Sequence, residues 1–159
     1  MSNLPTTPDT PQVAVERTED GLRLCLPASV ASIDAADAQV TRFLDGAAVP
    51  VDGFAVRILL REALLNAVLH GSGQDAGKQV RVGVALDRGG VVLTVEDDGP
   101  GFVRPARASV PDIAGDGGRG LALMQIYSSE MTFNGRGNRV VMRRNHEAPN
   151  LGNDSRERT

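Results

Sequence analysis

Three polar side chains recur at every fourth residue of the largely apolar stretch REALLNAVLHG (residues 61–71): Glu62, Asn66 and His70. Because four residues make slightly more than one helical turn, these groups form one stripe beside the apolar face of a helix. An amide oxygen such as that of Asn66 can ligate Mg²⁺, and a carboxylate one turn away can take a proton from a hydroxyl. The alternative is structural: Glu62 and Asn66 mark the solvated edge of a core helix, and His70 caps its end.

A second group of small and polar residues, VEDDGPGF (residues 95–102), follows an apolar strand pattern. Asp97 stands where the strand gives way to a loop, and a carboxylate held there can accept a hydrogen bond from the adenine 6-amino group. Guanine would present a carbonyl oxygen instead, so such an aspartate selects adenine. Gly99 and Gly101 would let the backbone approach a flat ring closely, although Asp-Gly-Pro-Gly is also ordinary turn chemistry.

A glycine-rich segment, GDGGRGLALM (residues 115–124), leads into a short amphipathic helix pattern. Free N–H groups and the positive end of the helix dipole attract anions at such a junction. Arg119 adds a charged contact that suits a phosphate. We therefore take Gly118, Arg119, Gly120 and Leu121 as candidate nucleotide-binding residues, with a surface loop and its caps as the alternative.

The elements that must position these groups are hairpins and helices. Alternating apolar residues predict three hairpins, at about residues 13–26, 79–97 and 130–144. Ser29 or Ser32 can cap a helix that runs to about Ala47, and Asp52 can cap the helix that ends at Gly71. Strands grouped in hairpins predict the α+β class, namely a two-layer α/β sandwich with a mostly antiparallel, mixed sheet and helices on one face.

Length and composition indicate one globular domain. The chain has 159 residues, of which 41% are hydrophobic and 23% charged. We expect flexible tails at residues 1–12 and 146–159 around a domain of residues 13–145. A net charge of −3, scattered basic residues and 3% aromatic content argue against nucleic acid as a partner. Lone Cys25 excludes an internal disulfide, and without a membrane span or signal pattern we expect a cytoplasmic protein with no membrane partner.

The three groups together contain what an ATP site needs, namely an adenine selector, a phosphate-binding loop and a Mg²⁺ ligand beside a candidate base. In this order and spacing, EALLNAVLHG, DDGPGF and GGRGLALM resemble the N, G1 and G2 boxes of the gyrase, chaperone, histidine-kinase and mismatch-repair (GHKL) ATPase superfamily. The resemblance covers about residues 20–144. Within the superfamily, the chain looks like the small serine kinases that act as anti-sigma factors in bacterial partner switching.

The resemblance implies a role for each matching residue. Asn66 would bind Mg²⁺, Glu62 would be the general base on a serine hydroxyl, and Asp97 would hold the adenine of ATP. Gly99 and Gly101 would shape the adenine pocket, Gly118, Arg119 and Gly120 would contact the phosphates, and residues 103–117 would form a mobile lid. The family usually carries a Gly-Thr pair late in its last hairpin, where this chain has Gly137-Asn138, an amide of different reach.

The resemblance also implies partners. The protein would phosphorylate a small antagonist of the anti-anti-sigma type, bind a sigma factor and form a homodimer through its first hairpin and first helix. The alternative is a nucleotide-switched binding module that controls an output other than a sigma factor, with weak or no kinase turnover. A two-component histidine kinase is disfavoured, because the segment before residue 50 contains no histidine to accept the phosphoryl group.

Overall fold

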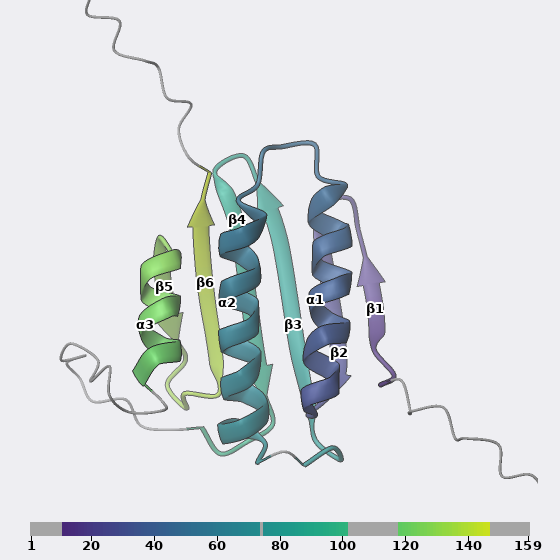
Figure 1. Cartoon of the computed structure of the whole chain (residues 1–159), viewed down its shortest axis with the longest axis vertical. Coiled ribbons are helices and arrows are strands. Elements are labelled where there is room, and N and C mark those ends of the chain that lie inside the picture. The colour runs from purple at the N-terminus through teal and green to yellow at the C-terminus, as the bar shows by residue number, and fades with distance from the viewer. Residues whose placement is uncertain (1–10, 74, 102–117, 147–159) are drawn as a thin grey trace, which may run out of the picture.

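The computed structural model describes residues 11–73, 75–101 and 118–146 (Figure 1). The elements in chain order are β1 (Ala14–Arg17), β2 (Gly21–Pro27), α1 (Val30–Asp45), α2 (Gly53–Leu65), the π-helical turn η1 (Asn66–Gly71), β3 (Gln79–Asp87), β4 (Gly90–Asp97), α3 (Gly118–Tyr127), β5 (Glu130–Phe133) and β6 (Arg139–Asn145). This order confirms the predicted succession of a hairpin, two helices, a hairpin, a helix and a hairpin.

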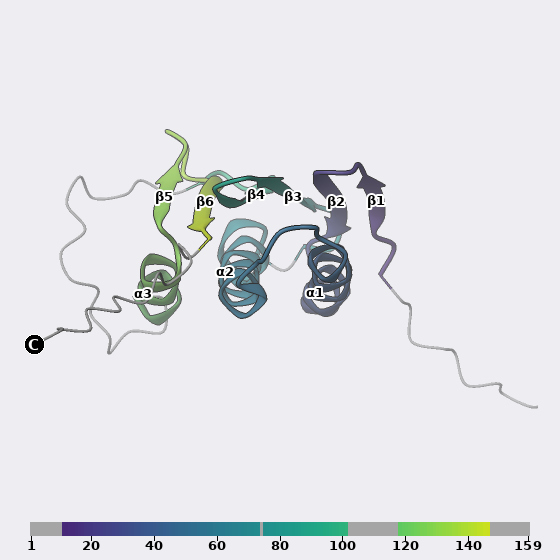
Figure 2. The ribbon, with the colours of Figure 1, turned by 90° about the horizontal axis from the view of Figure 1, so that it is seen from above.

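The six strands found among the described residues form one sheet in the order β1-β2-β3-β4-β6-β5. The three α-helices lie side by side on one face of it, as Figure 2 shows, and this confirms the predicted two-layer α/β sandwich of the α+β class. All neighbouring pairs among the described strands are antiparallel, so the predicted sheet is not mixed there. The reason is that the third hairpin joins β4 through β6. Its other strand, β5, runs in the same direction as β4 and would have paired in parallel.

Strand alternation separates an apolar face from a polar one. Leu22, Leu24 and Leu26 of β2 are each at most 2% exposed and point toward the helices. The matching core positions on the central strands are Val80, Val82, Val84, Val91, Leu93 and Val95. Intervening residues such as Arg23 and Arg81 point to the opposite, helix-free face.

The two long helices begin at the caps that the sequence predicts. The Ser29 hydroxyl accepts the N–H of Ser32 at the start of α1, and the Asp52 carboxylate accepts the N–H of Ala55 at the start of α2. Each bond satisfies one backbone donor that the helix itself leaves without a partner. Because α2 packs between α1 and α3 and against the central strands, its C-terminal end is held beside the sheet.

Several predictions concern segments outside the described residues. Residues 1–10 and 147–159 make up most of the two predicted tails, and residues 102–117 include the predicted lid. The domain limits and the lid therefore stay predictions. Over the described residues, no helix is long and apolar enough to cross a membrane.

Candidate functional site

A cavity of about 330 Å³ lies at the C-terminal end of α2. Its wall is built by α2 and η1, the end of β4, the middle of α3 and the β5–β6 hairpin. Four predicted site residues line it: Asn66, Asp97, Gly101 and Leu121. Most of the remaining wall is apolar, so the cavity combines a large apolar surface with a few polar groups, as sites for flat organic ligands do.

The last turn of the second helix is widened into the π-helical segment η1, which the amphipathic pattern did not predict. The N–H of Ser72 donates to the carbonyl of Ala67, five residues earlier, at 2.8 Å. The predicted helix end at Gly71 is correct, but the turn that leads to it is π rather than α. Such turns are rare and occur frequently at functional sites. Here the segment supplies both His70, an exposed side chain, and Gly71 to the cavity wall.

Asp97 is the last residue of β4 and is 7% exposed. Its Oδ1 accepts the N–H of Gly99 at 2.7 Å. Burial is the main cause that raises the pKa of this carboxyl above its usual range, and the Gly99 bond opposes that rise. A buried carboxylate that lines a cavity is a strong acceptor for a ligand amine, since water competes little with the ligand there.

Two glycines let the chain close around Asp97. A Cβ on Gly71 would overlap the Asp97 carboxylate, and a Cβ on Gly99 would overlap the carbonyl oxygen of Gly71. Gly99 does not itself line the cavity, so its missing side chain accommodates the protein's own backbone. The sequence indicated Gly71 only as a helix stop, and nothing in the local pattern shows that Asp97 would lie against it.

The loop after β4 and the β5–β6 hairpin close the far wall. Gly101 has a φ of +76°, and a Cβ there would overlap the carbonyl oxygen of Arg136. Asn138 lines the cavity, and its side-chain Nδ2 donates to the carbonyl oxygen of Asp97 at 2.9 Å. The sequence identified Asn138 only as a departure from the family pattern. The structure places it next to the candidate adenine selector.

Two residues of the predicted polar stripe, Glu62 in α2 and Asn66 at the start of η1, face the first turn of α3. A Cβ on Gly120 would lie 2.8 Å from Oε2 of Glu62 and 3.9 Å from Oδ1 of Asn66. The absence of a side chain therefore lets α3 come this close to both groups. Glu62 is half-buried and does not line the cavity, but it lies one helical turn from Asn66, which does.

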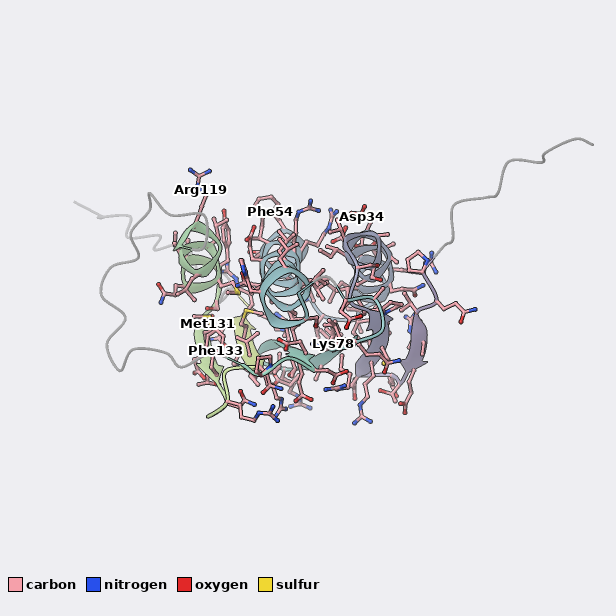
Figure 3. All side chains as sticks on the ribbon, turned by 90° about the horizontal axis from the view of Figure 1, so that it is seen from below. Asp34, Phe54, Lys78, Arg119, Met131 and Phe133 are labelled. Atoms are coloured by element: carbon pink, nitrogen blue, oxygen red, sulfur yellow. The ribbon has the colours of Figure 1, made fainter. Side chains whose placement is uncertain are left out.

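The remaining predicted phosphate contacts lie at the start of α3. Gly118 is the first residue of this helix, and Arg119 follows it. Figure 3 shows the side chain of Arg119 pointing away from the sheet on the outer side of the helix layer, and the residue is exposed. Neither residue lines the cavity in the described structure, so their contacts with phosphate stay predictions.

The helix-free face of the sheet carries a larger and shallower groove of about 590 Å³. Its central Arg81 donates to Glu96 at 2.7 Å and to Asp98 at 2.9 Å. The hydrogen bond from Arg81 is the main cause that lowers the pKa of Asp98. Because the charges of these side chains are already matched within the chain, the smaller cavity beside Asp97 is the better candidate for a ligand site.

Comparison with known proteins agrees with this geometry. Residues 26–144 match the histidine kinase-like ATPase domain family, and the chain belongs to this family. The chain is also similar to the anti-sigma F factor of Geobacillus sp. (strain WCH70), with 24% identity over 124 residues that cover 74% of this chain and 75% of that protein. Membership implies ATP binding. The cavity fits an adenine, because an apolar wall meets a buried hydrogen-bond acceptor.

Proposed function

We propose that the protein is an ATP-dependent serine kinase that phosphorylates a small antagonist protein of the anti-anti-sigma type and acts as an anti-sigma factor in partner switching. One observation carries the proposal: Asn66 lines the same cavity as Asp97, and Glu62 lies one helical turn from Asn66. Phosphoryl transfer requires a positioned nucleophile and charge stabilisation more than covalent chemistry from the protein. The similarity to a protein named an anti-sigma F factor supports the choice of partners.

Asp97 forms the adenine end of this site. Its carboxylate would accept a hydrogen bond from the 6-amino group, while the apolar wall would pack on the faces of the ring. Gly101 keeps the far wall close, because its positive φ and missing Cβ allow contact with the hairpin turn. The site would prefer adenine over guanine, because guanine would place its carbonyl oxygen, a second acceptor, opposite the Asp97 carboxylate.

Asn66 would hold Mg²⁺ together with the nucleotide phosphates. Among the described residues, no three His, Cys, Asp or Glu side chains gather closely enough to hold a metal ion by themselves. An oxygen ligand such as the Asn66 amide fits a cation that takes most of its ligands from phosphate and water. The ion, when bound, would neutralise charge on the phosphates. Arg119 and the N–H groups of Gly118 and Gly120 would add to this if α3 and the bound nucleotide approach each other.

Glu62 would act as the general base. In the transfer, the serine oxygen forms a bond to the γ-phosphorus, the bond from that phosphorus to the β,γ-bridging oxygen breaks, and ADP leaves. The serine proton passes to the Glu62 carboxylate. The proximity of Glu62 to Gly120 supports this role, because the carboxylate lies next to a residue of the predicted phosphate-binding turn.

The assembly is part of the proposal. A homodimer would join two copies through the β1–β2 hairpin and α1, where Val15 and Val30 are large apolar residues with 46% and 53% exposure. The sigma factor and the antagonist would bind the kinase alternately, and phosphorylation would release the antagonist. Sedimentation at micromolar concentration tests the dimer, and a purely monomeric wild type would overturn that part of the proposal.

The nucleotide site is tested by calorimetric titration of ATP and GTP with and without Mg²⁺. Wild type is expected to bind ATP and not GTP. Asp97→Ala is expected to abolish ATP binding, and Asn66→Ala to remove its dependence on Mg²⁺. Asp98→Ala is the matched control, since its carboxylate contacts Arg81 on the other face of the sheet. A wild type that binds no adenine nucleotide, or an Asp97→Ala variant that binds ATP like wild type, would contradict the proposed site.

The chemical step is tested with γ-labelled ATP and purified antagonist proteins that carry an exposed serine. Glu62→Ala is expected to keep its ATP affinity but to transfer phosphate on the order of 100-fold or more slowly. Glu130→Ala, at an exposed position of β5, serves as the control. Unchanged transfer by Glu62→Ala would disprove the base assignment. ATP binding without any transfer by wild type would instead identify a nucleotide-switched binding module.

A further inference from the structure

The β5–β6 turn is tied together by two asparagines. The N–H of Gly137 donates to the carbonyl of Asn134 at 3.0 Å, and Gly137 has a φ of +76°. Asn134 is exposed and does not line the cavity, whereas Asn138 is partly buried and does. Their amide groups are joined, because Nδ2 of Asn134 donates to Oδ1 of Asn138 at 2.8 Å.

These two amides belong to a chain of hydrogen bonds whose direction is determined at both ends. At one end, the N–H of Arg139 donates to Oδ1 of Asn134 at 3.2 Å. At the other end, Nδ2 of Asn138 donates to the carbonyl oxygen of Asp97 at 2.9 Å. A backbone N–H can only donate and a backbone carbonyl can only accept. Both amides are therefore oriented by backbone groups, and neither can turn over without opposing two donors or two acceptors.

The chain of bonds ends on the residue that carries the candidate adenine selector. Glu96 and Arg139 are the last paired residues of the β4–β6 ladder. Beyond them, the N–H of Asp97 donates to the carbonyl of Asn138 at 3.0 Å, and the Asn138 side chain supplies the donor for the Asp97 carbonyl. Asn138 thus holds the Asp97 backbone through both its N–H and its carbonyl, while the Gly99 N–H holds the Asp97 carboxylate.

We propose that Asn138 is a positioning residue that sets the Asp97 carboxylate for recognition of the adenine 6-amino group, and that Asn134 orients the Asn138 amide for this task. The inference rests on the proposed ATP site. It assigns selectivity for the base to two side chains outside the predicted site, one of which does not touch the cavity.

Asn134→Asp separates this role from ordinary packing, because it is nearly isosteric and lies on an exposed turn. The aspartate still accepts the N–H of Arg139 but can no longer donate to Oδ1 of Asn138. The Asn138 amide then faces an acceptor on both sides and can satisfy only one of them with its Nδ2. Asn138→Ala removes the donor to the Asp97 carbonyl outright.

The experiment measures Kd by calorimetry for ATP and for purine riboside triphosphate, which lacks the 6-amino group. If the Asp97 carboxylate is held less precisely, the affinity for ATP falls, whereas the affinity for the analogue is nearly unchanged. Asn138→Ala is expected to bind ATP about tenfold more weakly and to lose about the same factor of preference over the analogue. Asn134→Asp is expected to lower both the affinity for ATP and the preference for ATP over the analogue, but by smaller factors.

Asn145→Asp is the matched control. It makes the same chemical change at the opposite end of β6, where the side-chain oxygen accepts from Arg143 and an aspartate can do likewise. Equal weakening of both nucleotides in the Asn138 and Asn134 variants would overturn the inference, as would an Asn134→Asp variant indistinguishable from Asn145→Asp. Absence of ATP binding in wild type would instead overturn the proposed function, and the inference with it.

Discussion

Asp87 and Asp97 end the two strands of one hairpin with the same local geometry. In each case the N–H of the glycine two residues later donates to Oδ1 of the aspartate, at 2.8 Å for Gly89 and 2.7 Å for Gly99. Both turns are ordinary products of an Asp-x-Gly sequence. Because β3 and β4 are antiparallel, the two aspartates lie at opposite ends of the sheet.

Their electrostatic environments are opposite. The side chain of Asp87 is 54% exposed and forms an ion pair with Arg143 at 2.8 Å, and the hydrogen bond from Arg143 is the main cause that lowers its pKa. Asp97 is 7% exposed, and burial raises its pKa. The same turn therefore produces a solvated structural anchor at one end of the sheet and a buried acceptor in a cavity at the other. The comparison shows that turn geometry is local, whereas the chemical use of the carboxylate depends on what packs over it.

The largest expected difference between the two positions is in ligand binding. Asp97→Asn keeps an oxygen for the Gly99 N–H but turns Nδ2 toward the cavity, where it opposes the 6-amino group of adenine. We expect ATP affinity to fall roughly 100-fold, because two donors then face each other without water. Asp87→Asn is expected to bind ATP like wild type. Calorimetric titration of both variants checks this, and equal affinities would show that Asp97 does not contact the base.

Substitution of the glycines two residues after the aspartates is expected to have a smaller effect, which is on the stability of the fold. A Cβ on Gly99 would overlap the carbonyl oxygen of Gly71, which is backbone and cannot move aside cheaply. A Cβ on Gly89 would meet mainly the guanidinium of Arg143, the flexible end of a side chain, at 2.7 Å. We expect Gly99→Ala to lower the free energy of unfolding by about 1–3 kcal/mol and Gly89→Ala to lower it less. Urea unfolding of both variants measures the difference, and a larger loss in Gly89→Ala would contradict the close contact at Gly71.

The smallest expected effect is on the pH dependence of stability, and it has opposite signs at the two sites. Asp97 has a raised folded pKa, so its stabilising contribution is complete below the ordinary value of 3.8 and is lost as pH rises through the folded value. Asp87 has a lowered folded pKa, so its contribution is present above 3.8 and is lost as pH falls. At pH 7, Asp97→Asn is therefore expected to be more stable than wild type, and Asp87→Asn less stable.

Urea unfolding at pH 7 and at pH 3 checks these signs. The advantage of Asp97→Asn and the deficit of Asp87→Asn should both shrink at the lower pH. A stabilised Asp97→Asn variant that no longer binds ATP would indicate that the carboxylate is kept for binding at a cost to the fold. Loss of stability at pH 7 in both variants would contradict the raised pKa of Asp97.

Much of the fold could be predicted because its causes are local. Alternating apolar residues marked the hairpins, and Ser29 and Asp52 marked the helix starts by chemistry that needs only the next few residues. The π-helical turn at Asn66–Gly71 could not be predicted, because the same residue types can form either a π-helical or an α-helical turn. Gly71, at the end of this turn, packs against Asp97. Asp97 belongs to the strand β4, so this contact is not local in the sequence.

The sequence by itself determined the element order, the amphipathic faces and the residue types that can bind a nucleotide. Those properties depend on side-chain chemistry and on spacing along the chain. Only the tertiary structure decided which aspartate is buried, which glycine touches which backbone, and that Asn134 and Asn138 connect the last hairpin to Asp97. The physical reason is that these contacts join residues far apart in the chain. Their geometry exists only once β6 has paired with β4 and α2 has packed on the sheet.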